Sequence, residues 1–436
     1  MPMGPDEIRR YFRNKAIDSE WAFAGAKPSD TGKWTHDYHR YPAKFIPQLV
    51  ERLVDEYITT EDAHINDPFM GCGTTIVTGI SRGFHASGTD INKIAYLVTK
   101  VKATPIDPAR LEDRTTQFLT AVGEMLGSNQ ENSATPLLPQ KHIDRINYWF
   151  PEKNRDELGV LLRIIVQEAD PVFRDFLLVA FSNILKNCSI WLQGSTKPTR
   201  DMKKNPSRPR DMIRRQINKM KRGNRAFFNV APSRVASDIS HYLQIAQRDA
   251  RHQPAGENSV DLIVSSSPYV TSYEYADLHQ LSTIWLDFTD DLTEYRKSFI
   301  GTAHKRYDNQ VVPSLIARDI IERMATHSKK MAKEIEAFFL DMEGVFRESC
   351  RILKRGGRCC FVIGDTKLKG VEILNAEVFA ELLQHVGFKL DRVIKREIPS
   401  KILPQKRDEK TGRFASNATA DTQAYPIEYI VIGLKE

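Results

Sequence analysis

The chain has 436 residues, of which 41% are hydrophobic, and carries five cysteines and a formal net charge of +7. This composition is ordinary for a folded protein of two or three domains. Five cysteines without a Cys-x-x-Cys pair give neither a disulfide framework nor a zinc site, so no metal is expected. No apolar run approaches the roughly 20 residues of a membrane span, and the first residues lack a signal-peptide core. The sequence therefore predicts a cytoplasmic protein without a membrane partner.

The first predicted elements precede any recognisable motif. A lead-in of about 30 residues is followed by an aromatic-rich segment at 35–47 and by an amphipathic helix at 48–54. The apolar spacing of this helix predicts that one of its faces packs on a core.

The most informative segment is Ile65–Thr75, with the sequence INDPFMGCGTT. It predicts a buried strand, a glycine turn and the start of a helix. Gly71 and Gly73 let the backbone turn sharply and approach a ligand closely. Thr74 and Thr75 are candidates for capping the free amides of that helix, whose start also suits an anion.

An acidic residue, Asp90, follows Gly71 by 19 positions. An acid at about this distance from a glycine turn is where the ribose of a nucleoside is held, so a nucleoside-containing cofactor is predicted. The alternative is an ordinary strand–turn–helix corner. The order Asp-Pro-Phe and then Gly-x-Gly-Thr-Thr resembles the cofactor motif of the DNA amino-methyltransferases, which methylate exocyclic nitrogens using S-adenosylmethionine.

This resemblance implies a set of cofactor contacts. On the motif they are Asp67, Phe69, Gly71, Gly73, Thr74, Thr75 and Asp90. The segment Tyr41, Pro42 and Lys44 loosely matches one that closes over the methionine end of the cofactor in the family. Asp249 matches an acid that contacts the adenine amino group. The alternatives are an aromatic loop packed on the sheet and a solvated turn.

The middle of the chain has a different pattern, with helical spacing and many basic residues. Residues 105–235 are predicted to be a helical and basic insertion between a cofactor half at 1–104 and a catalytic half at 236–436. Apolar spacing predicts a helix across 158–185, and a short basic helix is expected at 212–220. In the family, an insertion at this place can serve as the target-recognition region.

The positive charge is concentrated in residues 197–225, which hold twelve basic and two acidic residues. The remainder of the chain is slightly acidic, so this segment is the predicted contact with a phosphate backbone. The alternative is a solvated charged face. The candidate DNA-binding residues are Lys197, Arg200, Lys203, Lys204, Arg208, Arg210, Arg214 and Arg215.

A second motif follows the apolar run 260–264, which predicts a buried strand. Ser266 to Tyr269 resembles the catalytic tetrad of the family, Ser/Asp/Asn-Pro-Pro-Tyr/Phe. The lone pair of a nucleobase amino group is conjugated with the ring and is therefore a poor nucleophile. The resemblance implies that the Ser266 side chain and the Ser267 carbonyl accept its hydrogens. It also implies that Tyr269 stacks on a base flipped out of the duplex.

The tetrad departs from the family at Ser267, which replaces the first proline and precedes Pro268. A backbone carbonyl survives this change, but the rigidity of two successive prolines is lost. Within the family that the tetrad resembles, serine at the first position favours cytosine N4 over adenine N6 as the target. Carbon-5 methylation is excluded because it uses a cysteine that typically follows proline, and none does here.

The later part of the chain predicts helices and strands but no further site residues. Residues 350–358 predict a helix ending in a Gly-Gly turn, and 359–365 a buried strand. A helix is expected at 376–386 and strands at 388–395 and 427–432. The resemblance implies an α/β, Rossmann-like methyltransferase fold with a mostly parallel seven-stranded sheet, interrupted by the largely helical insertion.

These observations predict a sequence-specific DNA methyltransferase that uses S-adenosylmethionine and acts on double-stranded DNA, of restriction-modification type. A cognate restriction endonuclease is a candidate partner, and the sequence leaves the oligomeric state open. Two rivals stay open, an RNA or transfer-RNA amino-methyltransferase and a non-catalytic DNA-binding relative.

Overall fold

The computed structural model describes residues 2–41, 44, 46–127, 135–195, 198–270, 275–301, 307, 310–398, 406–407, 422–423 and 427–436.

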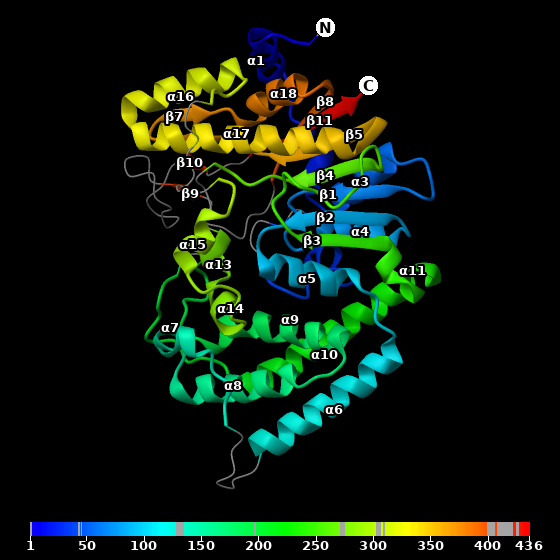
Figure 1. Cartoon of the computed structure of the whole chain (residues 1–436), viewed down its shortest axis with the longest axis vertical. Helices are drawn as coiled ribbons and strands as arrows, with labels where there is room; N and C mark the ends of the chain where they lie inside the picture. Colours follow the sequence, from blue (N-terminus) through cyan, green and yellow to red (C-terminus); the bar gives the residue numbers. More distant parts are fainter. Residues whose placement is uncertain are drawn as a thin grey trace.

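A twisted seven-stranded sheet forms the centre of the upper part of the molecule in Figure 1. Its strands, in spatial order, are β3 (Leu243–Gln247), β2 (His85–Asp90), β1 (His64–Asp67), β4 (Val260–Ser266), β5 (Leu353–Ile363), β11 (Ile427–Lys435) and β8 (Phe388–Glu397). Only β11 runs antiparallel to its neighbours, between β5 and β8. The predicted mostly parallel, Rossmann-like methyltransferase sheet is therefore confirmed.

The central strands are apolar because both faces of the sheet are covered. Successive side chains point to opposite faces, and the core divides accordingly. Phe361 and Val431 pack in a core under one layer of helices, whereas Val362 and Ile432 pack in a second core on the other side. The first layer holds α1 (Pro5–Arg13), α16 (Leu315–His327), α17 (Lys329–Ile352) and α18 (Asn375–His385). The second holds α3 (Pro47–Tyr57) and α4 (Thr74–Ser81).

A third core lies in the helical part below α5 (Lys93–Ala103) in Figure 1. The elements of this region are α6 (Pro108–Gly127), η2 (Gln140–His142), α7 (Ile143–Trp149), α8 (Glu152–Val166), α9 (Pro171–Cys188) and α10 (Pro209–Val230). The short helices α11 (Ser233–Ser237) and α12 (Ile239–Tyr242) follow and pack on the second core. The largely helical insertion is thus present, while its exact borders as a domain stay a prediction.

Two sequence-based helices differ from the structure. The helix expected across 158–185 is divided between α8 and α9, because Asp170 accepts a hydrogen bond from the Val172 amide (3.0 Å) and Pro171 begins a new helix. The short helix expected at 212–220 is the middle of the 22-residue α10. Its buried residues recur every three or four positions, which explains why it continues.

The Gly-Gly turn predicted to end a helix is also placed differently. Helix α17 already ends at Ile352, and Gly356 and Gly357 lie inside β5. The pairing register with β4 shifts across these glycines, and Gly356 has a φ of 77°. The glycines therefore form an irregularity in the strand rather than a helix cap.

The remaining elements are short. They are η1 (Ser19–Ala22), α2 (Pro28–Thr31), α13 (Tyr275–Leu278), α14 (Gln280–Trp285), α15 (Leu292–Lys297), β6 (Thr366–Leu368), β7 (Val371–Ile373), β9 (Lys406–Arg407) and β10 (Thr422–Gln423). Within the described ranges, no helix is both long and apolar enough to cross a bilayer.

Close packing of β1 and β2 depends on Gly88, where an added Cβ would lie 2.5 Å from the Asp67 carbonyl oxygen. We expect Gly88→Ala to lower the free energy of unfolding by about 1–3 kcal/mol, because backbone cannot yield as a flexible side chain can. Gly123→Ala is the matched control, since nothing lies within 4 Å of its added Cβ on α6. That change should raise stability by about 0.5–1 kcal/mol. Urea unfolding measures both, and equal effects would contradict the packing argument.

Candidate active site

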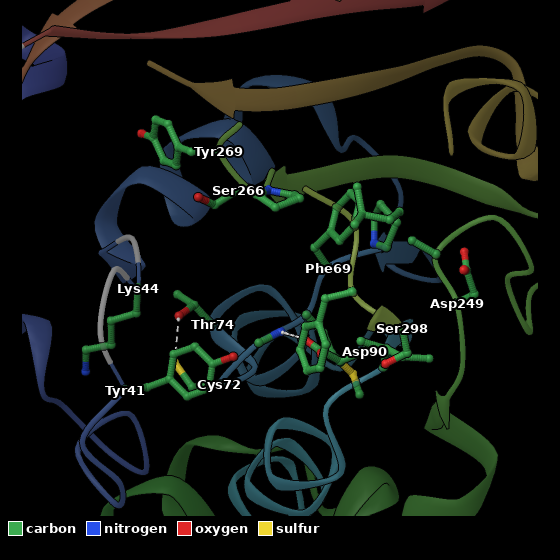
Figure 2. A pocket seen from close by; sticks show the side chains of 18 residues that line it. Tyr41, Lys44, Phe69, Cys72, Thr74, Asp90, Asp249, Ser266, Tyr269 and Ser298 are labelled. Carbon is green, nitrogen blue, oxygen red and sulfur yellow. Dashed lines mark hydrogen bonds between the residues drawn. The ribbon is translucent and has the colours of Figure 1, made fainter. Parts of the chain in front are cut away.

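A cleft opens where the parallel strands end, as expected for ligand sites in such sheets. It has about 890 Å³ of empty space, part of it open to solvent. The predicted site residues that line it are Tyr41, Lys44, Phe69, Gly71, Thr74, Asp90, Asp249, Ser266, Pro268 and Tyr269. Of these, Figure 2 labels Phe69, Thr74, Asp90, Asp249, Ser266 and Tyr269, which lie at or after the ends of β1, β2, β3 and β4, and Tyr41 and Lys44, which come from the segment before α3. Both sequence motifs therefore border one cleft.

The glycine loop after β1 has a backbone that favours glycine. Gly71 has a φ of 49° and Gly73 a φ of 78°, both in the left-handed region. A Cβ on Gly71 would lie 3.4 Å from the Tyr41 ring, and one on Gly73 would lie 2.8 Å from the Thr99 side chain. Gly73 is the N-cap of α4 and lies behind the cleft rather than on its wall.

Asp90 fixes the loop at its first glycine. Its Oδ2 accepts the Gly71 amide at 2.9 Å, and its Oδ1 accepts the Asn92 amide at 2.8 Å. Burial raises the pKa of this carboxyl to about 6, although both hydrogen bonds favour the ionised form. Each oxygen keeps a second lone pair, so the carboxylate on the wall of the cleft can still accept hydrogen bonds from a ligand.

Asp67 supports the site from behind. It is buried, and its Oδ1 accepts hydrogen bonds from the Phe69 amide (3.0 Å) and the Ser265 hydroxyl (2.6 Å). Burial raises the pKa of Asp67 to about 7. Thr75 also lies outside the cleft, and its hydroxyl donates to the Val264 carbonyl at 3.0 Å. The expectation that Thr75 caps the helix is therefore wrong, because that hydroxyl ties α4 to the tetrad strand.

The tetrad occupies the end of β4. Ser266 faces the cleft, and in the view of Figure 2 it lies between Tyr269 and Phe69. Ser267 is buried, its amide donates to the Val362 carbonyl at 3.2 Å, and its hydroxyl has no partner among the described residues. Ser267, which stands where the family has its first proline, is therefore fixed by a backbone hydrogen bond to β5 and not by a proline ring.

Asp249 lines the cleft but its carboxylate is already paired. It binds the Arg251 guanidinium at 3.0 and 2.8 Å, and Arg251 continues to the buried Asp341 at 2.6 Å. These acids hold Arg251 charged, with its pKa raised by the Asp249 hydrogen bond.

The segment that precedes the sheet covers the other side of the cleft. The Tyr41 ring packs on His279 with centroids 4.8 Å apart, and Lys44 donates to the His36 carbonyl at 3.0 Å. Pro42 lies outside the described residues. Burial lowers the pKa of His279 to about 4 and that of His39 to about 3, so both are neutral near pH 7.

Some lining residues were given no role by sequence reasoning. Ser298, Phe299 and Ile300 complete the wall beside Asp90 and Tyr269, just after α15. Their one signal is Gly301, which has a φ of 81° and would place a Cβ 3.1 Å from the Tyr269 carbonyl. A glycine 32 residues after the tetrad carries no pattern that would reveal this contact.

The basic segment is partly structural. Lys204 donates to the Lys186 and Trp191 carbonyls (2.8 and 2.7 Å), Arg208 pairs with Glu157 (2.8 Å), and Arg210 donates to the Leu126 carbonyl (3.2 Å).

The rest of the predicted basic set is exposed where the structure describes it. Arg200 lies 4.2 Å from the centre of the Tyr148 ring. Lys203, Arg214 and Arg215 form no ion pair with the described part of the chain, and Lys197 lies outside it. None of the described members of this basic set lines the cleft.

In the described ranges, no group of three His, Cys, Asp or Glu side chains is placed to hold a metal ion. All five cysteines are free thiols.

Known proteins that are similar to this chain include several DNA methyltransferases. A family model described as DNA methylase, covering the N6/N4 amino-methyltransferases, matches residues 5–100. The chain is 24% identical to the type II methyltransferase M.MvaI of Kocuria varians, across 94% of each chain. It is 20% identical to the type II methyltransferase M.BsoBI of Geobacillus stearothermophilus, across 81% of this chain and 78% of that one.

A solved structure gives a weaker likeness. The putative DNA modification methylase TTHA0409 of Thermus thermophilus is 18% identical over 41% of this chain and 48% of its own, with a TM-score of 0.21. The family model, the nearly full-length similarity to M.MvaI and the sheet order agree with the two motifs. The chain is thus similar to DNA amino-methyltransferases, in residues 5–100 by the family model and along most of its length by the likeness to M.MvaI.

Proposed function

We propose that this protein transfers a methyl group from S-adenosylmethionine to the exocyclic amino group of a flipped base in double-stranded DNA, with cytosine N4 as the favoured target. The observation that carries this proposal is the shared cleft, which is bordered by the glycine loop, Asp90 and the Ser266–Tyr269 tetrad.

The residues of the cleft fit such a cofactor. The second lone pairs of the Asp90 carboxylate on the cleft wall suit ribose hydroxyls, and Phe69 and Ile91 offer apolar surface for a purine. The Tyr41 ring over Gly71 and the nearby Lys44 suit the amino-acid end. Bound S-adenosylmethionine would supply an electrophilic methyl group, so the protein needs no nucleophile of its own.

The tetrad would act on the other substrate. The Ser266 hydroxyl and the Ser267 carbonyl accept hydrogen bonds from the target amino group, which localises its lone pair for attack. The nitrogen–carbon bond forms as the sulfur–carbon bond breaks, and the amino proton passes to water. Tyr269 holds the flipped base by stacking, at the price of unpairing it from the duplex.

The names of the relatives support a role in a type II restriction-modification system, with a cognate endonuclease as the candidate partner. We assign target recognition to the helical region 105–235. Adenine N6 is the second candidate target, and RNA methylation and DNA binding without catalysis are the rivals.

The test is transfer of labelled methyl from S-adenosylmethionine to duplex DNA of mixed sequence, followed by analysis of the nucleosides. We expect N4-methylcytosine. N6-methyladenine would keep the enzyme and change the base, label only on RNA would change the substrate class, and binding without transfer would favour the non-catalytic relative.

Ser266→Ala should reduce kcat by about 100- to 1000-fold, because one preorganised acceptor for the amino group is lost. Ser267→Ala is the matched control, since the Ser267 hydroxyl is buried without a partner among the described residues and its carbonyl is retained. Single-turnover methyl transfer by the two variants measures the difference. A large loss in Ser267→Ala with little in Ser266→Ala would reverse the assigned roles.

Cofactor binding should weaken in acid. The pKa of Asp90 is raised to about 6, so the group is ionised above pH 6 and gains a proton below it. A protonated carboxyl accepts ribose hydrogen bonds poorly, and the Kd should rise by up to about tenfold per pH unit below 6. Calorimetric titration from pH 8 to 5 measures this. Asp90→Asn should bind weakly at every pH without that step; a step that persists would point instead to Asp67.

Exposed arginines on α10 should contribute to DNA affinity. Changing Arg214 and Arg215 to Gln should weaken binding to all duplex sequences alike and lower the salt slope by about 0.9 for each phosphate that is no longer neutralised. Lys221→Gln is the matched control, because Lys221 is already paired with Glu112 at 2.8 Å. Filter binding across a salt series measures the slopes, and equal slopes in all three proteins would exclude this face of α10.

A further inference from the structure

Two side-chain amides join α10 to the segment that carries Tyr41. Gln216 on α10 donates from Nε2 to the Tyr38 carbonyl at 2.6 Å. Asn183 on α9 donates from Nδ2 to Gln216 Oε1 at 2.8 Å, and its Oδ1 accepts the Arg40 amide at 2.8 Å. We call Gln216 and Asn183 the amide bridge. Gln216 is 6% exposed, and its bond to the Tyr38 carbonyl is buried.

Helix α10 is seated closely on this segment at two further points. Lys219 pairs with Asp37 at 2.6 Å. A Cβ on Gly223 would collide with the Trp34 carbonyl and approach the Tyr38 ring to 2.8 Å. Only a residue without a side chain permits this approach, so α10 and residues 34–40 are fixed to each other.

Residues 34–40 lead directly to Tyr41, which lines the cleft. Tyr41 follows Arg40, and its ring lies over Gly71 and against His279. A shift of the backbone at 38–40 therefore moves the ring that covers the glycine loop.

The other side of α10 faces solvent. Arg214 and Arg215, which precede Gln216, are exposed and unpaired within the described residues. A phosphate backbone that binds these two arginines contacts the same helical turn as Gln216, which donates to the Tyr38 carbonyl.

We propose that the amide bridge couples DNA binding on α10 to the placement of Tyr41 over the cofactor, with Gln216 and Asn183 as positioning residues. The inference rests on the proposed function and concerns how its two ligands communicate. Thermodynamic linkage then requires that DNA raise cofactor affinity by the same factor as cofactor raises DNA affinity. A coupling of about fivefold or more is the usual range.

The experiment measures the Kd of S-adenosylhomocysteine, which has no methyl to transfer, with and without duplex DNA of mixed sequence. The wild-type protein should bind it at least about fivefold more tightly with the duplex. Gln216→Met, which keeps the volume and removes both hydrogen bonds, should bring this ratio close to one. Lys221→Met, on the same helix but paired with Glu112, should keep the wild-type ratio.

A second variant guards against a folding defect. Asn183→Asp keeps the acceptor for the Arg40 amide and replaces the donor to Gln216 with a charged oxygen, so it should reduce the ratio; the thermal midpoint of each variant is measured beside it to detect a folding defect. A wild-type ratio of one, or an unchanged ratio in both variants, would overturn the inference. Methyl transfer by the wild-type protein is followed in parallel, and its absence would count against the proposed function instead.

Discussion

The hydrogen bond from the Gly71 amide to the Asp90 carboxylate is the constraint on which the site depends. It joins the end of β2 to the loop after β1, and so fixes that loop at the carboxyl ends of the strands. The cost is a carboxylate held away from water, which the raised pKa records. That cost is offset only while two backbone amides point at the group, and the left-handed glycines let one of them do so. Loop, glycine conformation and buried acid are therefore one interdependent unit.

The sheet order brings the second half of the chemistry to this unit. Strand β4 lies next to β1, so Ser266 at the end of β4 lies beside the end of β1, although almost 200 residues separate it from Asp67 in sequence. The contact is reinforced at depth, where the Ser265 hydroxyl binds Asp67 and the Thr75 hydroxyl binds the Val264 carbonyl. These buried hydrogen bonds fix the glycine loop and the tetrad relative to each other, and methyl transfer between two bound substrates requires such fixed placement.

What the sequence allowed one to predict follows from the range of the forces involved. The turn at Gly71 and Gly73 and the strand before Ser266 are set by local conformation and apolar pattern, so they were predictable. The partners of Lys204, Arg208 and Arg210 are carbonyls and a carboxylate contributed by other parts of the chain, and a run of basic residues gives no sign of them. Gln216 was missed for the same reason, because a buried amide in a basic helix looks like any polar residue until its neighbours are known.

The place of β11 has a consequence for how the molecule assembles during synthesis. Residues 427–435 lie between β5 and β8, which precede them in the chain and form no pair with each other. Until β11 leaves the ribosome, β5 and β8 each present an open edge, the kind of surface that invites wrong partners. The sheet under the tetrad is thus completed long after the glycine motif has emerged. A nascent chain of this protein should therefore depend on chaperones until its last strand has been synthesised.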